Sequence, residues 1–508
     1  MRAVANLFAQ VEYRYLVAAA FVFGLFMDIL DTTIVNVALP RLAEEFHADT
    51  ATLEWVVTGY VLSLAVWVPA SGWIGDRFGT KKTFLFATAM FVIGSTLCGR
   101  AWSIESLVLF RIVQGVGGGM LTPVGTAMLY RAFTPAERAR ASAILSIPTM
   151  FAPMLGPLFG GFLVDAVSWR WIFYVNVPVG VLSFAFSWLV LKEHREPAAG
   201  KFDPAGFVFS GLGMAGVLFA LSRGPDDGWI SPIVLLTGLG GIACFVLLVI
   251  FETRNRAPML DLTLYCSKLF RTANLTGFMF MCTQFGMLFI LPLFLQQLLG
   301  LSAFESGLTT FPQPVGQILM VQFTSRMYHR LGARLNLLIG TGGIMLTTLL
   351  FLLVNLDTGL WWIRALVFLR GCFIAFNMVS MQTALFSAVP REKTGRASSL
   401  WNTTRQLAVA MGVAVAATVL IASLPGTGGG AGGLAGVPAG LGLAAFHTTI
   451  AVLAVMGGLA VFFAYQVRDP RHVVEPTNAR LVPVSEGHGA AGARAAAVAR
   501  DVVDQRHR

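Results

Sequence analysis

The stretch "FMDILDTTIVNVALP", residues 26–40, places two aspartates inside an apolar run that extends from 16 to 38. Asp28 and Asp31 are three positions apart, and residues at this spacing share one face of an α-helix. A run of about 20 apolar residues is long enough to cross the core of a bilayer. A carboxylate inside such a run costs roughly 2.5–3.5 kcal/mol or more, so it usually marks an ion or substrate pathway. The stretch therefore predicts a membrane-spanning helix with a functional polar face.

Long apolar runs recur through the whole chain. Of its 508 residues, 56% are hydrophobic and only 12% are charged, whereas soluble proteins carry about 25% charged residues. This composition predicts an all-α integral membrane protein. We expect fourteen membrane-spanning helices, at about 16–38, 55–74, 84–101, 105–129, 141–164, 170–191, 206–222, 231–251, 273–299, 306–324, 335–354, 360–386, 397–422 and 444–466.

The lysines and arginines predict the side of the membrane that each loop faces. An even number of spans places both termini on one side, and most of the 36 Lys and Arg residues then fall in segments on that side. The opposite loops hold Arg41, Arg100, Arg170, Arg223 and Arg364. Because cytoplasmic loops are the ones enriched in Lys and Arg, we expect both termini to lie inside a bacterial cytoplasmic (inner) membrane. The net charge of +10 then requires no nucleic-acid partner.

Other classes of function find no support in the sequence. The five cysteines form no C-x-x-C pair, so they predict neither a disulfide framework nor a zinc site; they are Cys98, Cys244, Cys266, Cys282 and Cys372. The glycines of "GVGGG" (115–119) follow no strand, and no G-K-[ST] motif occurs, which argues against ATP as the driving force. With no nucleophile–base pattern either, we expect no enzyme activity, no metal and no cofactor.

The first and second halves of the chain contain similar sequences. "DRFGTK" at 76–81 is echoed by "HRLGAR" at 329–334, and "RASA" at 140–143 by "RASS" at 396–399. Duplicated halves are a hallmark of secondary transporters. The predicted domains are a cytoplasmic N-terminus (1–15), an N-terminal six-helix half (16–191), a linker with two extra helices (192–272), a C-terminal six-helix half (273–466) and a disordered cytoplasmic tail (467–508).

Four motifs in order carry a specific resemblance. They are "LDTTIVNVALP" (30–40), "GWIGDRFGTKK" (72–82), "RIVQGVGGG" (111–119) and "APMLGPLFGG" (152–161). With them the chain resembles the major facilitator superfamily, and within it the fourteen-helix drug:proton antiporters of the EmrB/QacA type, over about 12–467. The resemblance implies export of amphipathic, cationic drugs or toxic compounds in exchange for protons, by alternating access. The expected partners are thus a small-molecule substrate, protons and the lipid bilayer; a periplasmic adaptor stays open.

The resemblance also implies that Asp31 and Arg111 serve proton coupling. At a rise of 1.5 Å per residue the two lie at about the same depth in the membrane, so they could pair. A static ion pair that only fixes packing is the alternative. Asp28 either titrates together with Asp31, which would give two protons per cycle, or is a polar wall of a cavity.

Two further motifs predict moving parts. The resemblance implies a cytoplasmic gate at Gly75, Asp76, Arg77, Gly79 and Lys81. In it the two glycines would give tight backbone geometry, and Asp76 would lie against a helix N-terminus near Arg396. The alternative is a basic loop that only sets topology. A helix bend typical of antiporters is expected at Pro153, Gly156, Pro157, Gly160 and Gly161, with a simple packing kink as the alternative.

The second half of the chain has arginines in its apolar runs but no acidic residue that could evidently pair with them. Arg370 mirrors Arg111, but no acid within 273–299 mirrors Asp31. A substrate cavity between the halves could be lined by Gln284, Gln317, Arg370, Asn377, Asn402 and Arg405. Two other functions stay open: an exporter of a lipid or of a self-made metabolite or antibiotic on the same fold, and a membrane sensor or scaffold without transport.

Overall fold

The computed structural model describes residues 11–467 apart from 49, 135–136, 198–199, 256–257, 388 and 425–436. Residues 1–10 and the predicted tail beyond 467 lie outside the described residues. The described part of the chain belongs to one compact unit that covers Met1–Pro470.

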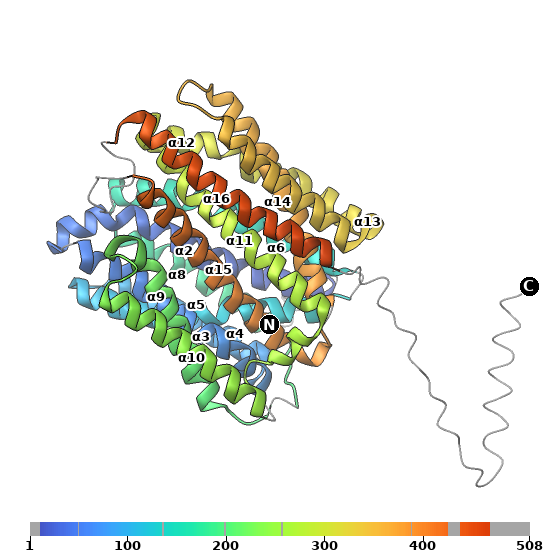
Figure 1. Ribbon diagram of the computed structural model, residues 1–508. Helices are drawn as coiled ribbons and strands as arrows, with labels where there is room; N and C mark the ends of the chain where they lie inside the picture. The colour runs from blue at the N-terminus through green and yellow to red at the C-terminus, as the bar shows by residue number, and fades with distance from the viewer. Residues whose placement is uncertain are drawn as a thin grey trace, which may run out of the picture. The chain divides into compact units, whose positions relative to one another are not determined.

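The described residues form helices and no strand (Figure 1). The first half of the chain contains α2 (Tyr13–Phe46), α3 (Thr50–Phe78), α4 (Thr80–Gly99), α5 (Ile104–Ala132), α6 (Arg138–Ala166), α7 (Trp171–Tyr174) and α8 (Asn176–Val190). The middle contains α9 (Pro204–Asp227), α10 (Pro232–Arg254) and the short η2 (Leu262–Cys266). The second half contains α11 (Lys268–Leu293), η3 (Phe294–Leu298), α12 (Ala303–Thr310), α13 (Pro312–Leu350), η4 (Phe351–Leu353), α14 (Leu360–Ser387), η5 (Arg391–Lys393), α15 (Thr394–Ala422) and α16 (Ala439–Gln466).

Within the described residues, twelve helices are long and apolar enough to cross a membrane. They include α9, which covers the short, glycine-rich run predicted at 206–222. The remaining predicted spans, 141–164 and 306–324, are helical in α6 and in α12 with the first part of α13, but they are not among the twelve. At Gly332 the backbone of α13 leaves the helical region (φ 80°, ψ 176°), so α13 consists of two helices joined at this glycine. An all-helical membrane fold is therefore confirmed, with about twelve candidate spans among the described residues, and the predicted count of fourteen is not confirmed.

Short polar motifs set where several helices begin. Ser103 caps α5 by accepting a hydrogen bond from Ser106 N, and the Ser106 side chain bonds back in a capping box. Asp203 caps α9 and is followed by Pro204 at the first helical position. Such caps satisfy backbone N–H groups that have no partner inside the helix.

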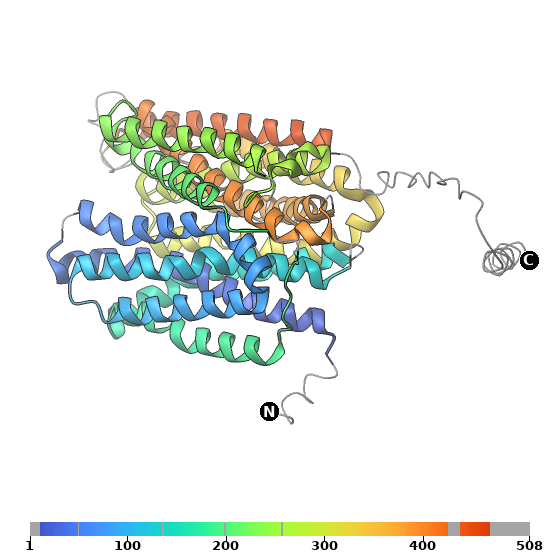
Figure 2. The same ribbon diagram turned by 90° about the horizontal axis from the view of Figure 1, so that it is seen from below.

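The helix bundle has two ends, which we name by their turns. The Gly79 end carries the connection between α3 and α4, and the Arg100 end carries the connection between α4 and α5. The long helices lie side by side (Figure 2). Helix α15 of the second half packs on α3 and α5, while α13 and α14 pack on α6.

Hydrogen bonds join the two halves at the Gly79 end. They link Tyr130 to Gln382 (2.9 Å), Ser142 to Thr383 (3.1 Å), Ser398 to the Pro123 carbonyl (2.7 Å) and Ser71 to Ser399 (2.9 Å). Arg138 donates to the Phe386 carbonyl, and the Phe386 ring stacks on Tyr130 at 4.1 Å. The halves are thus in close contact at the Gly79 end.

A salt bridge ties the segment after α10 to the start of α15. Lys393 Nζ lies 2.6 Å from Asp261 Oδ2, and Thr263 N donates to Asp261 Oδ1 at 3.1 Å. Burial acts to raise the pKa of Asp261. The hydrogen bond and positive charge of Lys393, together with the hydrogen bonds from Thr263, hold this pKa below its usual value. A carboxyl with a lowered folded-state pKa stabilises the fold above its unfolded-state pKa, and this contribution is lost as the pH falls below about 4.

We therefore expect Asp261→Asn to lower the free energy of unfolding at neutral pH by less than about 1 kcal/mol, because Lys393 is partly exposed. Thermal unfolding in detergent, compared between wild type and variant from about pH 7 to about pH 3, measures this. The difference between the two proteins should shrink as the pH falls. A difference that is the same at both pH values would contradict the assignment.

Candidate functional site

A buried charged cluster lies between α2, α5 and the junction of α7 and α8. Arg111 Nη1 donates to Asp31 Oδ2 at 2.5 Å. Gln114 Nε2 and Asn176 Nδ2 each donate to Asp31 Oδ1 at 2.9 Å. The Asp31 side chain is fully buried and Arg111 is 1% exposed. The carboxylate thus accepts three hydrogen bonds, and a single guanidinium compensates its charge.

The guanidinium of Arg111 is fixed from several directions. Its Nε donates to the Val56 carbonyl at 3.1 Å, and its Nη1 also donates to Gln114 Oε1 at 2.8 Å. Its Cζ lies 4.1 Å from the centre of the Tyr60 ring. Arg111 and Gln114 share a face of α5 because they are three positions apart. Removing one partner of such a buried pair is strongly destabilising, by about 3–5 kcal/mol, so any change in the charge of Asp31 acts on the four helices α2, α3, α5 and α8.

Asp28 lies in a different environment from Asp31. Tyr60 donates to Asp28 Oδ1 at 2.6 Å, and Thr122 donates to Asp28 Oδ2 at 3.2 Å. Both donors are neutral hydroxyls, and Asp28 is 7% exposed. The charge of Arg405 acts on Asp28 from α15 in the other half. Tyr60 connects the two aspartates, because its hydroxyl bonds one of them and its ring packs on the cation that bonds the other.

At the Gly79 end, Asp76 is 1% exposed and accepts a hydrogen bond from Arg131 Nη2 at 2.7 Å. A Cβ added to Gly395 would lie 2.6 Å from Asp76 Oδ1, so this carboxylate contacts the first turn of α15. The sequence predicted that Asp76 would lie at this helix N-terminus near Arg396, where a negative charge is favourable. The contact joins α3 of the first half to α15 of the second.

The segment at 191–196, after α8, holds the turn between α3 and α4. Glu193 Oε1 accepts from Lys81 N at 3.1 Å, and the His194 carbonyl accepts from Thr80 N at 2.9 Å. Gly79 has φ +106°, and a Cβ there would lie 2.2 Å from Glu193 Oε1. The turn therefore needs glycine at Gly79 for its backbone conformation and for the approach of Glu193.

The expected role of Gly75 in tight geometry is wrong. A Cβ on Gly75 would meet its nearest atom, on Val124, at an ordinary 3.6 Å. The close approach is one helical turn earlier, where a Cβ on Gly72 would lie 2.5 Å from the Gly395 carbonyl oxygen. A glycine in the motif therefore does not show which face of the helix meets a neighbour.

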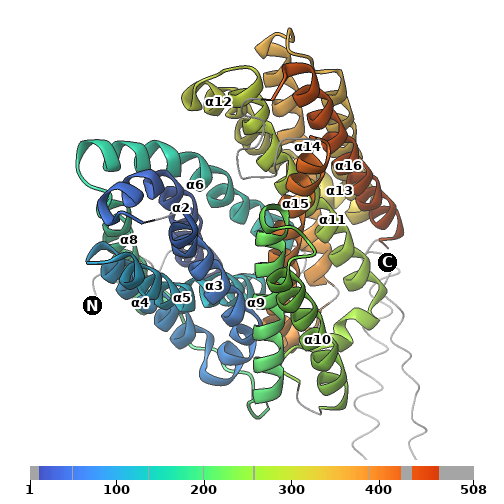
Figure 3. The same ribbon diagram turned by 60° about the vertical axis from the view of Figure 1, so that its left-hand side comes forward.

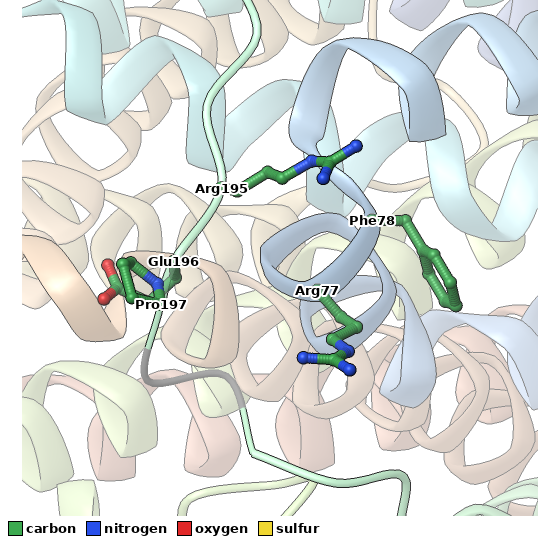
Figure 4. Close-up of a pocket in the computed structure, with 5 residues that line it drawn as sticks. All are labelled: Arg77, Phe78, Arg195, Glu196 and Pro197. Carbon is green, nitrogen blue, oxygen red and sulfur yellow. The ribbon is translucent and has the colours of Figure 1, made fainter.

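Arg77 faces away from the contact between α3 and α15. It is exposed, and it lines a hollow of about 400 Å³ with Phe78, Arg195, Glu196 and Pro197 (Figure 4). The extended segment that carries Arg195 and Glu196 runs beside the end of α3. Glu196 N donates to the Asp76 carbonyl at 2.9 Å, so this segment also bonds the backbone of the gate motif.

We expect Gly79→Ala to lower stability by about 1–3 kcal/mol, because it combines an unfavourable φ with a clash against Glu193. Gly228 is a matched control, since its backbone is similar (φ 85°, ψ 137°, against φ 106°, ψ 136°) and no atom lies within 4 Å of an added Cβ. Thermal unfolding in detergent should show a lower Tm for Gly79→Ala than for Gly228→Ala. Equal losses would mean that the Glu193 contact is unimportant.

The glycines of α6 bring this helix onto α2. A Cβ on Gly156 would lie 2.1 Å from Thr33 Oγ1, and a Cβ on Gly160 would lie 2.9 Å from Ile34 Cγ1. Gly161 has no atom within 4 Å and faces away. The structure does not describe the side chains of Pro153 and Pro157, which lie within the uninterrupted helix α6. Helix α6 therefore packs directly beside the segment that carries Asp31.

Residues 21–413 match the family model of the Major Facilitator Superfamily. The chain belongs to this family. It is 34% identical over 414 residues to the "Putative multidrug resistance protein MdtD" of Pectobacterium carotovorum subsp. carotovorum (strain PC1), covering 81% of this chain and 88% of that protein. It is 30% identical over 396 residues to the "Uncharacterized MFS-type transporter YhcA" of Bacillus subtilis (strain 168), covering 78% and 74%.

Among solved structures, the human organic anion transporter MFSD10 (TETRAN) matches with a TM-score of 0.64, over 89% of this chain and 99% of that one. At 14% identity this likeness shows the fold alone. The family and its fold identify a multi-pass membrane transporter of the major facilitator superfamily, and not an enzyme. The predicted family is therefore confirmed.

In the second half of this transporter, Arg370 occupies the counterpart of the Arg111 site with neutral partners. It donates to Thr348 Oγ1 at 2.6 Å and to Gln284 Oε1 at 3.2 Å. Gln284 thus accepts a hydrogen bond from Arg370, as Asp31 does from Arg111. Arg370 and Asn377 are at most 1% exposed, so neither presents a surface to a cavity in this structure.

The other expected cavity residues differ in their surroundings. Asn402 is buried and donates to the Ser398 carbonyl of its own helix at 2.9 Å, and Gln317 is 8% exposed. Arg405 is partly exposed, and its Nε is buried without a hydrogen-bond partner among the described residues. Within the same residues no group of three His, Cys, Asp or Glu side chains could hold a metal ion.

Sequence reasoning missed four residues that contact the aspartates. Gln114 lies in the same "RIVQGVGGG" motif as Arg111, and Asn176 lies in "WRWIFYVNVPVG" (169–180), so both were within reach of motif analysis. The sequence did not single out Tyr60 and Thr122, because it does not show in which direction a hydroxyl side chain in an apolar run points.

Proposed function

We propose that this transporter exports amphipathic, cationic compounds across the bacterial cytoplasmic membrane in exchange for protons. The observation that supports this most is the Asp31 site. It is a buried carboxylate with one cation, Arg111, and two neutral donors inside the membrane. Intramembrane acids of this kind mark ion pathways. The multidrug resistance protein named among the relatives supports a drug as the exported compound.

Proton coupling follows from the contacts of Asp31. When a proton binds the carboxylate, the ion pair with Arg111 is lost and α2 is held less tightly to α5. Because α6 packs on α2 through Gly156 and Gly160, the change reaches α6, which contacts the second half. Asp28 assists as a second titrating carboxylate, with Arg405 acting on it across the halves. The Gly79 end, which is closed here, opens in the alternate state.

The proposal includes fourteen spans, with α6 and the first part of α13 added to the twelve. The two six-helix halves are 16–191 and 273–466, and the segment 192–272 inserts two extra helices between them. The Gly79 end is cytoplasmic, together with both termini. The lysines and arginines of the loops at that end support this orientation, among them Arg77, Lys81, Lys82, Arg131 and Arg140.

The experiment that tests the function uses proteoliposomes with an imposed pH gradient and the fluorescent cation ethidium. The wild-type protein should move ethidium against the direction of proton flow and stop when an ionophore collapses the gradient. If the protein ignores both dye and gradient, the drug:proton assignment fails for this class of compound. Lipids and anionic metabolites would then be the next substrates to examine.

A further inference from the structure

Helix α15 turns one face toward the first half of the chain. It packs on α3 and α5, and α9 lies beside it (Figure 3). Ser398, Asn402 and Arg405 share one face of α15, because they follow each other at steps of four and three residues. Ser398 donates to the Pro123 carbonyl of α5 at 2.7 Å, so this face meets the first half. Arg405 is two turns, or about 10 Å, farther toward the Arg100 end.

Arg405 brings a positive charge to this face without a partner for it. No hydrogen bond or salt bridge of its side chain occurs among the described residues, and its Nε is buried without an acceptor. The side chain is nevertheless partly exposed. An arginine inside a spanning helix is costly and usually pairs with an acid or with backbone carbonyls. The guanidinium of Arg405 therefore has hydrogen-bond donors left for a ligand.

Asp28 supplies the opposite charge from the first half. It accepts a hydrogen bond from Thr122, and the next residue, Pro123, is the one that Ser398 contacts. Asp28 thus lies next to the contact between α5 and α15. The charges of Asp28 and Arg405 act on each other across the halves, but within the described residues neither side chain forms a salt bridge.

Asp31 differs from both of these residues, because the adjacent guanidinium of Arg111 compensates its charge. Asp28 has only the neutral hydroxyls of Tyr60 and Thr122 as hydrogen-bond donors. The charges that lack a bonded counter-ion between the halves are therefore one carboxylate on α2 and one guanidinium on α15.

We propose that the region between the halves binds amphipathic compounds that carry a carboxylate in addition to their cationic group. The carboxylate of the compound binds the guanidinium of Arg405, and its cationic group binds Asp28. This inference rests on the proposed function, because it narrows the class of exported cations to compounds with both charges.

The two protein charges select this class over simpler ions. A plain cation next to Asp28 is repelled by Arg405, and a plain anion next to Arg405 is repelled by Asp28. A compound with both groups compensates both charges, which are costly inside the membrane when they are left unpaired. A guanidinium also binds a carboxylate through two parallel hydrogen bonds, which adds geometric selectivity. Arg405 is thus a specificity-determining residue.

The test compares rhodamine B, which carries a free carboxylate beside its cationic ring system, with its methyl ester, which carries only the cation. Both dyes are titrated onto the full-length protein in detergent, with protein-free micelles as the baseline, and fluorescence anisotropy gives each Kd. Wild type should bind rhodamine B at least about tenfold more tightly than the ester, equivalent to about 1.4 kcal/mol. Arg405→Gln should abolish this preference by weakening the binding of rhodamine B alone. Its unchanged binding of the ester then shows that the variant is folded.

Three further variants separate the roles of the two charges. Arg405→Lys keeps the charge but loses the two parallel hydrogen bonds, so it should retain part of the preference. Asp28→Asn should weaken the binding of both dyes to a similar extent, because both carry the cation. Arg100→Gln, the matched control, removes an exposed arginine outside this face and should leave both Kd values unchanged.

Equal Kd values of the two dyes in wild type would overturn the proposal. An equal loss of both dyes in Arg405→Gln would also overturn it, because the arginine would then be structural. Binding requires no proton gradient, so this result is independent of the ethidium assay. A protein that moves ethidium but does not distinguish the two dyes retains the proposed function and loses the assigned class of compound. A protein that prefers rhodamine B but ignores ethidium and the gradient retains the site and loses the drug:proton assignment.

Discussion

Asp31→Asn is expected to abolish transport driven by a pH gradient, with a loss of at least about 100-fold, or about 2.7 kcal/mol. The variant keeps a hydrogen-bonding side chain of the same size next to Arg111, Gln114 and Asn176. It can no longer exchange a proton, and Arg111 loses its counter-charge. The measurement is uphill ethidium flux in proteoliposomes at matched protein density.

A second readout separates coupling from folding in this variant. Exchange of ethidium down its own gradient needs substrate binding and movement of the halves, but no net proton transfer. Asp31→Asn should retain this exchange. Asp28→Asn should keep part of the uphill transport, since the partners of Asp28 are the neutral Tyr60 and Thr122. Full proton-driven transport by Asp31→Asn would exclude the site, whereas loss of both activities would indicate misfolding, to be checked by the Tm.

Gly72→Ala is expected to reduce transport by roughly 5- to 150-fold, because it opposes closure of the Gly79 end. The added Cβ would lie 2.5 Å from the Gly395 carbonyl oxygen and 2.7 Å from Ser399 Oγ. Overpacking of this kind costs about 1–3 kcal/mol. The cost applies only when α3 and α15 are in contact, so the variant should favour the state in which this end is open.

Gly75→Ala is the matched control for Gly72→Ala, because its Cβ has room in the same helix. The state is measured by maleimide labelling of Ser398→Cys, a position that is fully buried here, in a Cys266→Ser background. Labelling from the Gly79 side should rise in Gly72→Ala and stay at the wild-type level in Gly75→Ala. Equal labelling in all three proteins would show that the contact does not control closure.

The helices were predictable because membrane thickness fixes the length of an apolar run. The span expected at 360–386 is α14, Leu360–Ser387, and the span expected at 397–422 is α15, Thr394–Ala422. Composition could not show that the helices of the runs at 306–324 and 335–354 join directly at one glycine. A single glycine, Gly332, turns the chain there without a loop.

The sequence predicted the depth of the candidate site in the membrane, but not the direction in which the side chains of each helix point. Counting residues along two helices brings Asp31 and Arg111 to one level, since the rise per residue is constant. The rotation of each helix depends on packing, so Tyr60 and Asn176 could not be selected from many similar residues. For the same reason the sequence could not show that Arg370 bonds within its own half or that Asn377 is fully buried.

Movement of substrate and protons in opposite directions through this protein is the mechanism that we propose. Its most direct test starts with no pH gradient and an outward gradient of tetraphenylphosphonium across proteoliposomes, with the interior pH followed by an enclosed dye. Efflux of tetraphenylphosphonium should acidify the interior in wild type and leave its pH unchanged in Asp31→Asn. Efflux through the wild-type protein without any change of interior pH would contradict it.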